Sequence, residues 1–212
     1  MNLNYKLKPN YNVLLDLSSP IRKTGTGTNI KLSCISNWFF VSTIFLLISL
    51  AVGSVLLKCL RISTILIPQE VYNELSEISQ FNDVHGKAAQ ETIRMISNGN
   101  IEVDEVEHVD KINELVSGYS RINEGEAEAL ILAQKKSISI LITDDFRSIP
   151  DLKKNSGDVE IHLSIYLLAR LVLEKIISIA EAQDALNRIS EGRTWESAAI
   201  YNLAKKYIEE LK

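Results

Sequence analysis

The sequence predicts an α/β fold, a three-layer α/β/α sandwich built on a parallel sheet. From Ile62 onward, short apolar runs alternate with stretches of helical periodicity, which is the pattern of strands joined by crossover helices. Several of these runs carry no charge, as is typical of strands that helices cover on both faces. After the last apolar run only helical patterns remain, so residues 164–212 are expected to form a helical C-terminal region.

The apolar runs and the periodic stretches give the expected elements in chain order. Strands are expected at Ile62–Ile67, Ile101–Val106, Ile138–Ile142 and Val159–Leu163. Helices are expected at Pro68–Leu75, Val84–Ser97, Asp110–Tyr119, Asn123–Lys136, Ile165–Lys175, Ser178–Ser190 and Trp195–Leu211.

Helix-start signals support three of these assignments. Pro68 suits the first helical position, because its fixed φ matches a helix and its missing N–H has no intrahelical partner there. Asn123 with Glu126, and Ser178 with Glu181, have the spacing of a capping box, in which two residues bind each other's backbone N–H groups.

The charge-free stretch Trp38–Leu57 has two interpretations. It is long enough to cross a membrane, which would make residues 38–57 a single-span anchor. It also fits a buried first strand near Phe39–Phe45 followed by a helix near Leu47–Leu60. We favour the buried strand, because the basic residues on the two sides of the stretch are nearly balanced and give no strong orientation signal.

The remaining N-terminal segment, residues 1–36, is polar and irregular and is expected to be an extension of a single domain over residues 37–212. Cys34 and Cys59 form neither a metal-binding spacing nor a disulfide framework. Isolated cysteines fit a reducing compartment, so a cytoplasmic protein is expected.

Charge and histidine spacing argue against two classes of site. The net charge is −4, and the basic excess lies in residues 1–36, so the expected domain is acidic and does not offer a broad basic groove for nucleic acid. The three histidines are far apart in the sequence, which argues against a zinc site.

Acidic residues follow the expected strands and are the best candidates for chemistry. Glu74 lies after one strand, Glu126 opens the helix before another, and Asp144 and Asp145 directly follow that strand. In a parallel sheet these positions meet at the carboxyl edge, where carboxylate oxygens suit Mg²⁺ or Mn²⁺. Thr143 would orient a water or a carboxylate. The plainer alternative is that Glu126 only caps a helix and the Asp pair only starts a turn.

Three segments together resemble the PIN domain family, in particular its small prokaryotic members such as the VapC-type toxins. The segments are Ile67-Pro68-Gln69-Glu70-Val71-Tyr72-Asn73-Glu74-Leu75, Glu124-Gly125-Glu126-Ala127-Glu128-Ala129 and Leu141-Ile142-Thr143-Asp144-Asp145. The resemblance extends over residues 41–212. It implies a Rossmann-like α/β/α fold and a magnesium- or manganese-dependent endoribonuclease.

By this resemblance Glu74 matches the second acid of the family, Glu126 the third, and Asp145, with Asp144 beside it, the fourth. Thr143 matches the small hydroxyl residue before the last acid. The expected partners are then an RNA substrate, an antitoxin protein if the chain is a toxin, and a second copy of the chain.

The sequence departs from the family at the first acid, which normally ends the first strand. The best register places Thr43 there, and Thr43 cannot replace a carboxylate as a metal ligand. Asn37 and Asp16 are alternatives that need a shifted register or a long insertion. Two hypotheses follow: a metal-dependent ribonuclease, or a degenerate PIN module that binds RNA or a protein without cutting.

Overall fold

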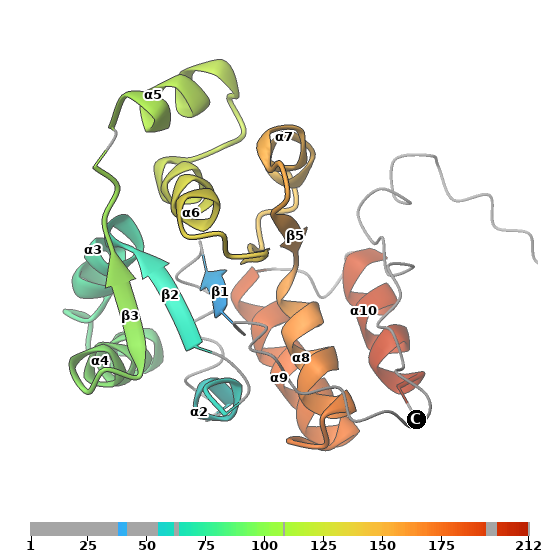
Figure 1. The fold of residues 1–212 in the computed structure, drawn as a ribbon. Helices are drawn as coiled ribbons and strands as arrows, with labels where there is room; N and C mark the ends of the chain where they lie inside the picture. Colours follow the sequence, from blue (N-terminus) through green and yellow to red (C-terminus); the bar gives the residue numbers. More distant parts are fainter. Residues whose placement is uncertain (1–37, 42–54, 62–63, 108, 194–198, 212) are drawn as a thin grey trace, which may run out of the picture. The chain divides into compact units, whose positions relative to one another are not determined.

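A central parallel sheet organises the computed structural model, which describes residues 38–41, 55–61, 64–107, 109–193 and 199–211. Its strands are β1 (Trp38–Val41), β2 (Thr64–Pro68), β3 (Ile101–Asp104), β4 (Ile140–Ile142) and β5 (Glu160–His162). They pair in the order β3-β2-β1-β4-β5, and every pairing is parallel (Figure 1). The predicted α/β class and the parallel sheet are confirmed.

Helices fill the connections between the strands and form the C-terminal region. They are α2 (Val55–Cys59), α3 (Gln69–Ile78), α4 (Val84–Ser97), α5 (Val109–Gly118), α6 (Glu124–Lys135), α7 (Ile149–Asn155), α8 (Ser164–Leu173), α9 (Ile179–Arg193) and α10 (Ala199–Glu209). Figure 1 shows α6 and α7 on one side of the sheet and α2, α8 and α9 on the other. This arrangement gives the three expected layers, with residues Ser36–Lys212 forming one compact unit.

The register of the parallel strands places their carboxyl ends at one edge of the sheet. Phe39 of β1 is aligned with Ile65 of β2 on one side and with Ile140 of β4 on the other. Because all strands run in the same direction, the segments that follow β2, β3 and β4 leave from the same carboxyl edge. A site built there can draw on residues that are distant in the sequence.

The first strand is the central strand, as the buried interpretation of the charge-free stretch requires. Trp38–Val41 pairs with β2 and β4, and Val55–Cys59 forms the short helix α2, whose residues Val55, Leu56 and Cys59 are buried. Residues 42–54 lie outside the described residues, as does the expected extension over residues 1–36. Within the part of the chain that the structure describes, none of the helices combines the length and the apolar character of a membrane span.

Burial on both faces explains the charge-free strands. Ile65, Leu66, Ile67 and Pro68 are all buried, although successive side chains of a strand point to opposite faces. Each fully buried Leu or Ile side chain contributes about 1.5–3 kcal/mol relative to its exposed state. The apolar runs that predicted the strands therefore contribute to the core together with buried helix residues, which are the larger number.

The helix α6 is the most deeply enclosed helix that the structure describes in detail. All nine residues from Gly125 to Ala133 are buried, and α6 contacts α3, α5, β1, β2 and β4. A helix that is covered all round carries its side chains into the interior in several directions. This burial decides where the acidic residues of its first turns lie.

Most expected elements agree with the structure within a few residues, and two differ. Helix α4 has the predicted bounds Val84–Ser97, whereas Pro68 ends β2 with an extended ψ of 158° and α3 begins at Gln69. The helix α7 was not expected. Pro68 has the φ of −65° that a proline ring imposes, and this φ fits a strand end as well as a helix start.

A close approach of backbone to backbone fixes the turn between α3 and α4 and yields the first prediction. A Cβ atom at Gly86 would lie 1.8 Å from the carbonyl oxygen of Phe81. Gly86→Ala should therefore lower the free energy of unfolding by roughly 1–3 kcal/mol, because overpacking outweighs the helix propensity gained, about 1 kcal/mol. Urea denaturation measures the change.

Gly118→Ala is the matched control, because a Cβ atom at Gly118 meets nothing within 4 Å. This variant should be neutral or stabilised by up to about 1 kcal/mol. Equal free energies of unfolding for the two variants would contradict the predicted clash at Gly86.

Candidate functional site

The carboxylate of Glu126 lies at the carboxyl edge of β4, inside the first turn of α6. The predicted capping box is present: Glu126 donates its backbone N–H to Asn123 Oδ1 at 2.8 Å, and Asn123 donates its N–H to Glu126 Oε2 at 3.2 Å. Glu126 has 0% exposure. The capping box therefore fixes a fully buried acid in one orientation at the start of α6.

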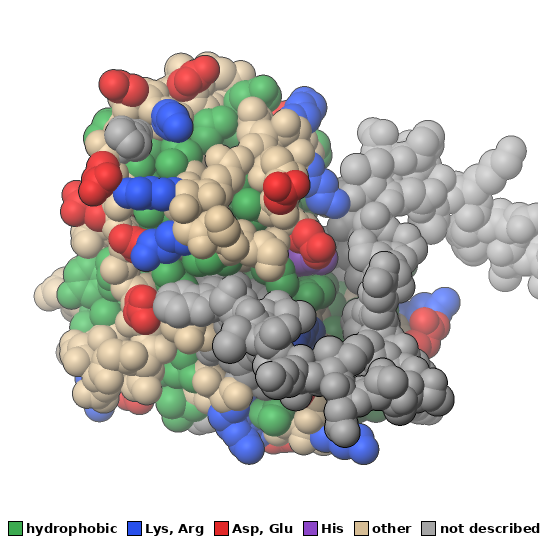
Figure 2. All heavy atoms as spheres, viewed as in Figure 1, with side chains coloured by type: hydrophobic (Ala, Val, Ile, Leu, Met, Phe, Trp, Pro, Cys, Tyr) green, Lys and Arg blue, Asp and Glu red, His purple; other side chains and the backbone are tan. Residues whose placement is uncertain are grey.

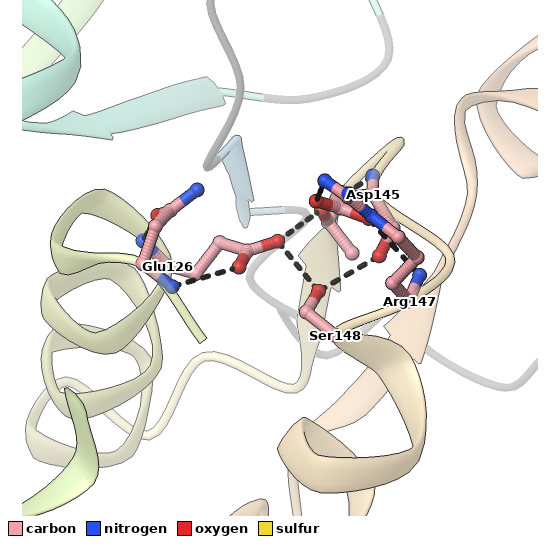
Figure 3. A network of polar contacts seen from close by, with 6 residues as sticks. Glu126, Asp145, Arg147 and Ser148 are labelled. Atoms are coloured by element: carbon pink, nitrogen blue, oxygen red, sulfur yellow. Dashed lines mark hydrogen bonds and ion pairs between the residues drawn. The ribbon is translucent and has the colours of Figure 1, made fainter. Parts of the chain in front are cut away.

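Two hydroxyl groups from the opposite side complete the hydrogen bonding of Glu126 (Figure 3). Thr143 Oγ1 donates to Glu126 Oε1 at 2.9 Å, and Ser148 Oγ donates to the same oxygen at 2.6 Å. Thr143 Oγ1 in turn accepts the backbone N–H of Asp145 at 3.2 Å. The single carboxylate thus joins the start of α6 to the end of β4 and to the segment before α7.

Burial has the largest effect on the pKa of Glu126. Removal of its carboxylate from water raises its pKa above the ordinary value, and the negative charge of Asp145 raises it further. The hydrogen bonds from Ser148, from the Asn123 amide and from Thr143 lower the pKa, but they do not cancel the effect of burial. Glu126 therefore holds its proton more tightly than an exposed glutamate does.

Asp145 faces solvent more than Glu126 and is bound by an arginine. Arg147 donates Nε–H to Asp145 Oδ1 at 3.0 Å and Nη2–H to Oδ2 at 2.8 Å, and its backbone N–H also reaches Oδ1 at 3.0 Å. The Asp145 side chain is 17% exposed, whereas the Arg147 side chain is 75% exposed. Figure 3 shows the guanidinium beside Asp145, close to the Glu126 network.

Asp144 is buried and contacts another part of the fold. Its Oδ1 accepts the backbone N–H of Ser164 at 3.0 Å, at the first residue of α8. The N-cap residue of α8, Leu163, has no side chain that can do this. Asp144 thus supplies from the end of β4 the capping hydrogen bond that α8 cannot supply itself.

Two further acidic residues, Glu74 and Glu128, are associated with α3. Glu74 is exposed on α3. Glu128 is buried on α6, and its Oε2 accepts the backbone N–H of Glu70 at 3.0 Å, in the first turn of α3. Burial raises the pKa of Glu128, while bonds from the amides of Glu70 and Val106 lower it and the charges of Glu70 and Glu105 raise it. Glu128 therefore ties α6 to α3 and to the segment after β3.

The structure places two of the predicted metal ligands near each other. Glu126 and Asp145 are carboxylates from different elements that lie close enough for the charge of one to raise the pKa of the other, and their oxygens fit Mg²⁺ or Mn²⁺ in chemistry. Among the described residues, no group of three or more His, Cys, Asp or Glu side chains could hold a metal ion. The four-residue set Glu74, Glu126, Asp144 and Asp145 therefore stays a prediction.

Three residues considered for the first acid lie outside the described residues. These are Thr43, Asn37 and Asp16. The structure therefore does not place the position where the family pattern and this sequence differ.

Sequence reasoning missed Arg147 and Ser148, although one signal was available. Ser148-Ile149-Pro150-Asp151 reads as a helix start, with a capping residue, Pro at an early position and an acid in the first turn. This signal would have found α7. It would not have found the site, because the Ser148 hydroxyl makes no capping bond to α7 and donates to Glu126 instead.

The second prediction concerns the pH dependence of stability. Because the folded protein protonates Glu126 above its ordinary pKa of 4.5, this group favours folding below that pH and loses the effect as pH rises through the raised pKa. Glu126→Gln does not titrate, so its free energy of unfolding relative to wild type should increase between about pH 4 and pH 8. A constant loss from the altered bond to Asn123 adds to this.

Glu124→Gln is the control for this measurement, since Glu124 lies in the same helical turn with an exposed side chain. Chemical denaturation across the pH range should show no comparable trend for this variant. A pH-independent difference between Glu126→Gln and wild type would contradict the raised pKa of Glu126.

The third prediction tests the hydroxyl of Thr143. Thr143→Val keeps the shape of the side chain but removes both the donor to Glu126 and the acceptor for the Asp145 amide. Because buried polar groups then lose partners, the free energy of unfolding at neutral pH should fall by about 1–3 kcal/mol. Thr143→Ser retains the hydroxyl and should lose clearly less; similar losses for both variants would assign the effect to packing.

Comparison with known proteins gives the family of the chain. No curated protein and no solved structure matches the sequence significantly. A family model described as a PIN domain matches residues 42–210, which is most of the chain and includes every residue of the site described above. The α/β fold with its parallel sheet agrees with this match. The chain belongs to the PIN domain family.

Proposed function

We propose that this protein is a divalent-metal-dependent endoribonuclease of the PIN type. The observation that carries the proposal is the pairing of Glu126 with Asp145 at the carboxyl edge of β4, inside a fold whose members are nuclease-type modules. PIN domains generally use divalent metal ions. A buried acid beside a more exposed acid is the electrostatic arrangement in which a cation is stabilised.

The residues of the site have separate tasks in this proposal. Glu126 and Asp145 would hold Mg²⁺ or Mn²⁺, with Glu74 and Asp144 as the further candidates from the sequence. The ion supplies a polarised phosphoryl oxygen and an activated water near neutral pH. Thr143 and Ser148 keep the Glu126 carboxylate oriented, because both hydroxyls donate to its Oε1. The burial of Glu126 excludes water from one side of the site.

The mixed surface charge fits a protein that would contact phosphate through a bound metal ion and not through a basic surface. On the face shown in Figure 2, the described Lys and Arg side chains are interspersed with Asp and Glu side chains and do not form a continuous basic surface. A nucleic acid would then gain little from general electrostatic attraction. Local groups at the acidic site would have to recognise the phosphodiester.

The second candidate function is a PIN module that binds RNA or a protein without cutting. Two observations favour it: the described residues contain no three-acid group, and the best sequence register places Thr43 at the first acid. Loss of one ligand weakens a metal site by about tenfold or more. The toxin role, an antitoxin partner and a homodimer are proposals that rest on the family alone.

Cleavage of RNA by the purified protein is the fourth prediction. Single-stranded and structured RNA should be cut when Mg²⁺ or Mn²⁺ is added and left intact when the metal is chelated. Glu126→Gln and Asp145→Asn should each lower the rate by about a hundredfold or more, as expected for loss of a metal-binding carboxylate.

Glu124→Gln is again the control, because it removes a negative charge from the same helical turn outside the network. Its rate should equal that of wild type. If RNA stays intact at all metal concentrations while the protein still binds RNA, the non-cutting module replaces the nuclease.

A further inference from the structure

We propose that Arg147 is a built-in counter-cation that competes with the divalent metal ion for Asp145 and thereby weakens metal binding. This inference rests on the proposed function, because it concerns the same pair of acids. It names a residue that neither the sequence pattern nor the family match assigns to the site.

The contacts of Arg147 cover both oxygens of Asp145. The guanidinium binds Oδ1 at 3.0 Å and Oδ2 at 2.8 Å, and the backbone N–H of Arg147 binds Oδ1 as well. This parallel two-point geometry is the strongest that an arginine makes with a carboxylate. A metal ion that binds either oxygen from the same side would have to displace the guanidinium.

Arg147 places its positive charge at Asp145. The pKa of Arg147 is raised by its hydrogen bonds and charge interaction with Asp145 and, to a smaller extent, by the charge of Glu126. One positive side chain therefore occupies the carboxylate of Asp145, which the metal ion would also bind. Because like charges repel, the guanidinium and a divalent cation cannot both be stabilised at this position.

Exposure makes the exchange feasible. Arg147 is 75% exposed, so water takes over its hydrogen bonds when it leaves, whereas Asp145 is held at 17% exposure by the surrounding segment. The backbone of this segment is anchored independently of the guanidinium, since Ser148 donates its N–H to the carbonyl of Asp145 at 3.1 Å. The side chain can therefore turn away while both acids keep their places.

Calorimetric titration of the full chain with Mn²⁺ tests the inference and is the fifth prediction. Arg147→Ala should bind Mn²⁺ about tenfold more tightly than wild type, because a competing positive charge is removed from Asp145. Arg147→Lys retains the charge without the two-point geometry and should lie between the two. Adding Glu126→Gln to the Arg147→Ala variant should reverse the gain, which locates the bound ion at these acids.

Arg94→Ala is the matched control. Arg94 is a similarly exposed arginine, 69%, that forms an ion pair with Glu91 at 3.0 Å on α4. The substitution changes the net charge of the protein by the same amount, so it should leave the affinity for Mn²⁺ unchanged. If Arg94→Ala gained as much Mn²⁺ affinity as Arg147→Ala, the gain would be a general effect of net charge, and the proposed local competition at Asp145 would be overturned.

The outcomes separate this inference from the proposed nuclease. Tighter binding by Arg147→Ala without RNA cleavage by any variant supports the counter-cation and rejects the nuclease. Equal or weaker binding by Arg147→Ala, together with RNA cleavage by wild type, overturns the counter-cation alone. Absence of Mn²⁺ binding in wild type and in every variant overturns both.

Discussion

The burial of the Glu126 carboxylate is the constraint on which the rest of the site depends. A carboxylate with no solvent exposure needs nearly all of its hydrogen bonds from protein. Its three donors come from the start of α6, from the residue after β4 and from the residue before α7. Three segments that are separate in the sequence are therefore held at one point of the sheet edge.

The acidic sequence of α6 serves this architecture in two directions. Glu126 faces the segment after β4, whereas Glu128, two residues later, faces the first turn of α3. Both carboxylates accept hydrogen bonds from other elements, so each one holds α6 against a neighbouring segment in addition to adding a negative charge. The burial of α6 on all sides is what allows residues so close in sequence to reach different neighbours.

Local signals made most of the fold predictable. The strands β1, β2 and β4 showed as charge-free runs, and the capping residues Asn123 and Ser178 marked helix starts that the structure contains. The sequence singled out Glu126 and Asp145 as candidates, but it did not reveal their partners. Ser148 reaches Glu126 across a distance in sequence that no periodicity reports, and Arg147 follows Asp145 too closely to be separated from an ordinary turn. The burial of Glu128 depends on packing around the whole of α6.

The alignment of Phe39 with Ile140 has a consequence for folding during synthesis on the ribosome. The central strand is synthesised early, but one of its two neighbours leaves the ribosome only after β2, β3 and their helices have been made. Such distant pairing closes slowly, because a long loop loses entropy before the contact is gained. Until then one side of β1 is an open edge, the kind of surface on which nascent chains aggregate and to which chaperones bind.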